Sequence, residues 1–156
     1  MIVAKNPGAL KKFRRTPWRF QQTIQIPETE TLKDFIACIL DHHGEMEEAT
    51  ATIENVVNGA GCLEKLGPAG EPVELQRDLS FQAESREEIA ALLMAAFIDG
   101  PDFIFIPPPK PFMFMFYADN DYWITFYANT KSNLNHVILP LQAAGYKMIP
   151  NWQREL

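Results

Sequence analysis

The chain has 156 residues, of which 47% are hydrophobic, and it carries a formal net charge of −6. This size suits one domain with a buried core, so the composition excludes a wholly disordered chain. No apolar stretch approaches the ~20 residues that span a bilayer, and no apolar segment follows the basic N-terminus, so we expect neither a membrane protein nor a secretory signal. The two cysteines are too few for a disulfide framework and indicate reduced thiols in an acidic, cytoplasmic protein.

Basic residues are concentrated at the N-terminus. Six lysines and arginines precede Glu28 and no acid does, whereas acids dominate from Glu28 to Glu88. Residues 1–17 contain two prolines and a glycine and show no clear period. The sequence therefore predicts a basic arm over residues 1–17 and a single α+β domain over residues 18–156.

The predicted domain begins with a strand and a helix. Residues 18–27 alternate apolar and polar side chains, which predicts a strand. Residues 28–43 have apolar side chains at spacings of three and four, and His43 continues this stripe, which predicts an amphipathic helix. Residues 45–59 fit a helix and also a strand, and we expect a helix there. Residues 59–83 are rich in glycine and proline and predict an irregular connection.

A third predicted helix has a clear start signal. Ser85 and Glu88 form the S-x-x-E pattern of a capping box, and an apolar stripe follows, which predicts a helix over residues 85–97. A short extended segment and a proline-rich bend come next.

The last part of the chain predicts a hairpin and a helix. Residues 112–127 form two strand-like runs with a tight turn at Asp119 and Asn120. Residues 132–145 predict a helix with Ser132 as its N-cap. The order of elements predicts an α+β fold, a mainly antiparallel sheet with helices packed on one face, and a ferredoxin-like topology is compatible with it.

Asp41, His42 and His43 end an apolar run. They resemble the Asp-His-His motif of a family of metal-dependent phosphoesterases, in which these residues follow a buried strand and bind divalent metal. Here the run before Asp41 has the period of a helix, and consecutive helical side chains point about 100° apart. We therefore expect a helix end, with a metal site as the alternative.

Asp119 and Asp121 follow an apolar strand as a D-x-D pattern. This pattern resembles the metal and nucleotide-sugar site of many glycosyltransferases, where two carboxylates and a hard cation hold a diphosphate. A hairpin turn explains the same residues. The alternative hypothesis of a small metal-dependent phosphoesterase or transferase has these candidate ligands: Asp41, His42, His43, His136, Asp119 and Asp121.

Cations and aromatic residues are interleaved over residues 11–20. The cations are Lys11, Lys12, Arg14, Arg15 and Arg19. Such a mixture can bind phosphates and stack on bases, so nucleic-acid binding is a second alternative. A solvated arm whose aromatic rings pack onto the fold is the simpler explanation.

Aromatic residues crowd the predicted hairpin. A two-layer fold cannot bury all of them, so we expect a binding surface made by Tyr117, Tyr122, Trp123 and Tyr127. The preferred hypothesis is an interaction module that binds a protein partner, or a second copy, through this hairpin and acidic side chains, a character shared by immunity and inhibitor proteins. We expect no cofactor and no catalysis, because the chain has no nucleophile elbow, P-loop or dinucleotide fingerprint.

Overall fold

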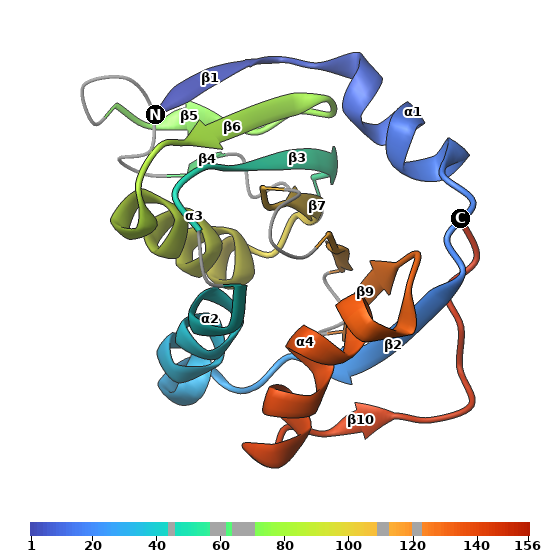
Figure 1. Cartoon of the computed structure of the whole chain (residues 1–156). Coiled ribbons are helices and arrows are strands. Elements are labelled where there is room, and N and C mark those ends of the chain that lie inside the picture. Colours follow the sequence, from blue (N-terminus) through green and yellow to red (C-terminus); the bar gives the residue numbers. More distant parts are fainter. Residues whose placement is uncertain (44–45, 57–61, 64–70, 109–112, 120–122) are drawn as a thin grey trace.

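The computed structural model describes residues 1–43, 46–56, 62–63, 71–108, 113–119 and 123–156. Within these residues it contains four helices, an eight-stranded antiparallel sheet and a small two-stranded sheet, which confirms the predicted α+β class (Figure 1). The elements in chain order are β1 (Ile2–Lys5), α1 (Pro7–Arg15), β2 (Phe20–Gln25), α2 (Thr29–His43), β3 (Ala49–Asn55), β4 (Cys62–Leu63), β5 (Val73–Glu74), β6 (Leu79–Ala83), α3 (Arg86–Asp99), β7 (Asp102–Ile106), β8 (Met115–Ala118), β9 (Trp123–Ala128), α4 (Lys131–Ala143) and β10 (Met148–Ile149).

The large sheet contains two similar connections. Its strand order is β1-β6-β3-β7-β8-β9-β2-β10. β6 and β7 both pair antiparallel with β3, so they run parallel to each other, and α3 joins them across β3. β9 and β10 flank β2 in the same way and are joined by α4. Ferredoxin-like folds also use such split β-α-β units, but a ferredoxin-like topology for the whole chain stays a prediction.

One face of the sheet carries the main core. Phe105, Phe116 and Phe126 lie side by side on three neighbouring strands, with ring centroids 4.8 Å and 5.4 Å apart. The helices α2, α3 and α4 lie together on this side (Figure 1) and contribute the buried stripes that their spacing predicted. Burying each of these phenylalanine side chains contributes about 2 kcal/mol of transfer free energy.

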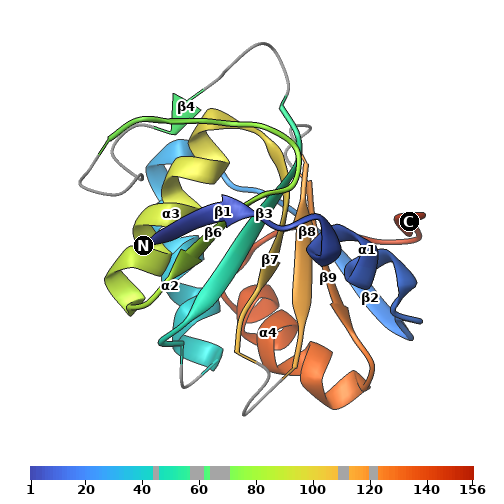
Figure 2. The same ribbon diagram turned by 90° about the horizontal axis from the view of Figure 1, so that it is seen from above.

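The N-terminal residues differ from the predicted arm. β1 forms an edge of the sheet, and α1 lies on the face opposite to the other three helices (Figures 1 and 2). Leu10 and Phe13 of α1 are buried against Ile104, Met115 and Tyr127. The apolar positions of this short segment lie between cations, and helices of this length are stabilised mainly by tertiary packing, so its period alone was a weak signal.

Two segments of the sheet also differ from their predictions. β3 occupies part of the region where we expected a helix, and β6 lies in the predicted irregular connection. Residues 49–53 carry an alternating pattern that also fits a helix stripe, and β3 has a strand on each side of it, so pairing decides between the two.

The start of α3 confirms its predicted cap. The Ser85 hydroxyl accepts a hydrogen bond from the N–H of Glu88 at 3.2 Å, and the Glu88 carboxylate accepts one from the N–H of Glu84 at 2.9 Å. The amino group of Met1 forms an ion pair with Glu88 at 3.1 Å. The chain terminus, β1 and α3 are therefore tied together at this corner.

The cap of α4 differs from its prediction and gives a direct test. Thr130 is the N-cap, and its hydroxyl accepts a hydrogen bond from the N–H of Asn133 at 3.1 Å, whereas Ser132 lies inside the helix. Replacing Thr130 with alanine should lower the free energy of unfolding by about 1 kcal/mol. Ser132→Ala should change it by less than about 0.5 kcal/mol. Denaturant unfolding of both variants measures the difference, and equal losses would contradict this assignment.

Candidate functional site

The C-terminal segment crosses the face of the sheet that α1 partly covers. It ends beside α1 in both views (Figures 1 and 2). The Gln21 side chain of β2 fixes it through two hydrogen bonds: its oxygen accepts from the Arg154 N–H at 2.8 Å, and its amide donates to the Arg154 carbonyl at 3.4 Å. Since both backbone groups of one residue are held, the position of this segment on the sheet is well defined.

The side chain of Arg154 connects Asp119, which follows β8, with Thr125 of β9. Its guanidinium forms an ion pair with Asp119 at 2.8 Å and donates to the Thr125 hydroxyl at 3.1 Å. The Arg154 and Asp119 side chains are only 13% and 14% exposed. Thr125 itself is hydrogen-bonded to Thr23 at 2.8 Å, so a continuous polar network joins β2, β8, β9 and the C-terminal segment.

Aromatic rings surround the same guanidinium. It lies 4.4 Å from the ring centroid of Tyr117 and 5.2 Å from that of Trp152, within the range of cation–π attraction. Trp152 also packs edge-to-face on Trp123, with centroids 4.6 Å apart, and remains 36% exposed. We call the group formed by Tyr117, Trp123, Trp152 and Arg154 the tryptophan–arginine patch.

The structure divides the four aromatic residues predicted to form a surface. Tyr117 and Trp123 are half-buried members of the patch. Tyr127 is only 1% exposed and packs against Phe13 of α1, so its prediction as a surface residue is wrong in this structure. Tyr122 lies outside the described residues.

Two tyrosines on this face titrate above their usual range. Burial raises the pKa of Tyr117 to about 12, and the charge of Asp102 adds to this effect while Arg154 opposes it. Burial also raises the pKa of Tyr127 to about 12, and Arg154 again opposes the shift. Both hydroxyls therefore stay protonated well beyond neutral pH, and neither is poised to act as a base there.

The raised tyrosine pKa values predict alkaline instability. Because the folded state favours the protonated hydroxyls, this stabilisation is complete below the ordinary tyrosine pKa of about 10 and is lost as the pH rises through about 12. The free energy of unfolding should therefore fall more steeply between about pH 10 and pH 12 in the wild type than in Tyr127→Phe. Denaturant unfolding across this range measures the two slopes, and identical slopes would contradict the prediction.

The candidate metal ligands near the end of α2 have other partners. Asp41 is exposed and forms an ion pair with Arg86, and His42 donates through Nδ1 to the carbonyl of Cys38 at 2.8 Å. His43 is fully buried, and its Nε2 lies 2.8 Å from the carbonyl of Pro108. Because a carbonyl only accepts, Nε2 carries the proton. The predicted helix end is thus observed, with His43 in the core.

The other candidate ligands lie elsewhere. Asp119 is occupied by Arg154 on the opposite face of the sheet from α2, His136 is exposed on α4, and Asp121 lies outside the described residues. Across the described part of the chain, no three histidine, cysteine, aspartate or glutamate side chains form a group that could hold a metal ion. Burial also raises the pKa of Cys38, as does the nearby charge of Asp41, which suits an unreactive thiol.

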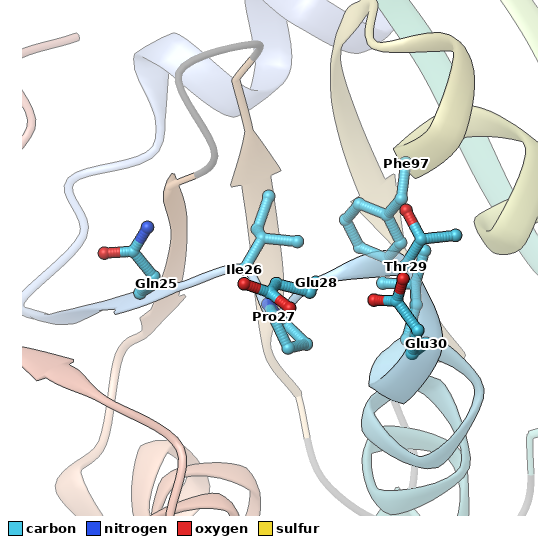
Figure 3. Close-up of a pocket in the computed structure, with 8 residues that line it drawn as sticks. Gln25, Ile26, Pro27, Glu28, Thr29, Glu30 and Phe97 are labelled. Atoms are coloured by element: carbon cyan, nitrogen blue, oxygen red, sulfur yellow. The ribbon is translucent and has the colours of Figure 1, made fainter.

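A pocket of about 470 Å³ opens where β2 meets α2 (Figure 3). Phe97 of α3 lies beside the connecting residues there, and Glu28 and Glu30 are among the residues that line the pocket. These acids already supply negative charge at the N-terminal end of α2, where the helix dipole favours it. The titratable side chains among the residues that line this pocket are those of Glu28 and Glu30.

Sequence reasoning missed Trp152 and Arg154. Both lie in a short C-terminal segment without regular periodicity, and their partners are residues 21, 117, 119, 123 and 125. The one available signal was composition, because tryptophan and arginine together are typical of contact surfaces.

None of the described helices is long and apolar enough to cross a membrane. Comparisons of the chain with family models, curated proteins and solved structures find no match.

Proposed function

We propose that this chain is a protein-binding module and that the tryptophan–arginine patch is its contact surface. The single observation that carries the proposal is the partly exposed Trp152, packed on Trp123 beside a guanidinium held in place. Tryptophan, tyrosine and arginine are the residues that most often dominate the binding energy of protein interfaces. The patch brings these three residue types together on one surface.

Preorganisation supports a binding role. Arg154 is fixed by Asp119 and Thr125, and its backbone is fixed by Gln21. Ordering a long side chain when a complex forms costs about 0.5–1.5 kcal/mol. Because the arginine and tryptophan of the patch are already ordered, binding a partner there avoids most of this cost. The patch is therefore suited to bind without rearrangement.

The proposed contact surface differs from the one expected from the sequence. It keeps Tyr117 and Trp123 of the aromatic hairpin, removes Tyr127, and adds Trp152 and Arg154. Exposed acids such as Glu30, Asp34 and Glu87 lie on α2 and α3, on the other side of the sheet. These acids are therefore not part of the proposed contact surface.

Site-specific photo-crosslinking tests the proposed surface. A photoreactive amino acid replaces either Gln153, next to the patch, or Gln142 on α4, which is equally a surface glutamine. We expect one protein partner to be crosslinked from position 153 and not from position 142, and we expect Trp152→Ala to abolish that adduct. Equal crosslinking from both positions, or an adduct that survives Trp152→Ala, would contradict the proposal.

A further inference from the structure

The outward side of α1 presents a row of cations. Gly8, Lys11, Lys12 and Arg15 recur at the i, i+3, i+4 and i+7 spacing of one helix face, opposite the buried face that contains Leu10 and Phe13. With Thr16 and Pro17 they line a shallow, open depression of about 540 Å³. We call Lys11, Lys12 and Arg15 the basic stripe.

The charges of the basic stripe are not neutralised by the described residues. Lys11, Lys12 and Arg15 are exposed, and none forms an ion pair with a residue in the described part of the chain. Arg14 differs, because it turns toward the sheet and pairs with the buried Glu54. The stripe is thus a set of three available cations.

The sign of this surface contrasts with the rest of the molecule. The chain has 14 basic and 20 acidic residues, and six of the basic residues but none of the acids precede Glu28, so residues 28–156 carry a net charge of −12. A polyanion that approached elsewhere would meet this negative charge. The folding of residues 7–15 onto the sheet therefore concentrates positive charge at one place on an acidic protein.

We infer that the basic stripe is a binding site for the phosphate backbone of nucleic acid, separate from the proposed protein contact. Protein interfaces need an apolar centre and are depleted in lysine, whereas the exposed side of α1 offers only cations and small residues. Insertion into a membrane needs a free apolar helix face, and that face of α1 is buried against the sheet. Phosphates need only positive charge and an open approach.

The binding is independent of base sequence. Phe13, which directly follows Lys12, is buried, and Trp18, three residues after Arg15, uses its indole N–H to donate to the carbonyl of Phe13 at 3.0 Å. Its ring packs on Phe13 and Tyr127, with both centroid distances 5.8 Å. Since this ring is engaged within the fold, the stripe acts through phosphate contacts alone. Three such contacts predict weak binding, with a slope of log K against log salt of about −2 to −3.

Fluorescence anisotropy with a labelled oligothymidylate and a labelled mixed-sequence duplex, each of about twenty nucleotides or base pairs, tests the inference. The full chain is compared with K11A/K12A/R15A and with K33A/K131A/K147A, which removes the same charge from three exposed lysines outside the stripe. At low salt we expect the stripe variant to bind at least tenfold more weakly and with a slope near zero, and the control variant to bind like the wild type within about twofold. Circular dichroism checks that both variants stay folded.

Three outcomes would overturn the inference. The first is no binding of either probe by the wild type at low salt. The second is an equal loss in the stripe variant and the control variant, because binding would then depend on net charge and not on the stripe. The third is equally tight, stripe-dependent binding of polyglutamate, of vesicles of anionic lipid or of a second copy of the chain, which would identify the stripe as a general site for negative charge.

Discussion

Replacing Phe13 with alanine should lower the free energy of unfolding by about 3–5 kcal/mol. The ring is 1% exposed and packs on Tyr127 and Tyr117, with centroids 5.2 Å and 6.4 Å away. A domain of this size is stable by about 5–15 kcal/mol, so the loss is a large fraction of the total. An N-terminal arm that did not belong to the fold would show almost no change.

Lys12→Ala is the matched control for Phe13→Ala. It lies on the same helix, faces solvent, and should change the free energy of unfolding by less than about 0.5 kcal/mol. Denaturant unfolding of both variants, followed by fluorescence and circular dichroism, measures the difference. Equal stability of the two variants would show that α1 does not help to hold the sheet.

Arg154→Ala should be the most damaging change in the C-terminal segment. It leaves the Asp119 carboxylate mostly buried and without this ion pair, and it removes the cation from the Tyr117 and Trp152 rings. Removing one partner of a buried pair costs about 3–5 kcal/mol, and the slight exposure of this pair lowers our expectation to about 2–3 kcal/mol. Adding Asp119→Asn to the Arg154→Ala variant should recover part of the lost free energy of unfolding, because the buried carboxylate charge is then removed.

Arg86→Ala provides the comparison for Arg154→Ala. Arg86 also pairs with an aspartate, Asp41, but both side chains of that pair are about half exposed. Exposed pairs contribute about 0–1 kcal/mol, so this variant should be almost as stable as the wild type. Urea unfolding measures the free energy of unfolding of the two variants. A loss in Arg86→Ala as large as that in Arg154→Ala would contradict the role given to burial.

Elements with strong local signals could be predicted from the sequence. The capping box of Ser85 and Glu88, the stripe of α2 and the alternation of β2 each combine a period with a boundary residue, and the structure contains all three elements. The aromatic hairpin of β8 and β9 is also observed, with Ala118 opposite Ile124.

Elements that depend on distant partners could not be predicted in the same way. α1 is short and gains its stability from Ile104 and Met115, which lie about 90 to 105 residues further along the chain than Leu10 and Phe13. β3 became a strand because β6 and β7 pair with both of its edges. Local propensity contains no information about either contact.

The candidate site depends even more on contacts between residues that are distant in the sequence. Arg154 contacts Gln21, Asp119 and Thr125, and these residues come together only when the sheet has formed. The sequence identified Tyr117 and Trp123 by type, but it did not identify the arginine and the tryptophan that the C-terminal segment adds. In the same way, the apolar stripe placed His43 in the core, whereas its hydrogen bond to Pro108 needed the structure.

The most direct test of the tryptophan–arginine patch as the contact surface is the affinity of the crosslinked partner for the Trp152→Ala variant. Trp152 and Leu139 are both large exposed apolar residues, 36% and 53% exposed, but Leu139 lies on α4 on the other side of the sheet. By calorimetry we expect Trp152→Ala to weaken binding by about 30-fold, the effect of a 2 kcal/mol interface hot spot, and Leu139→Ala to leave it within about twofold. Wild-type affinity in Trp152→Ala would contradict the tryptophan–arginine patch as the contact surface.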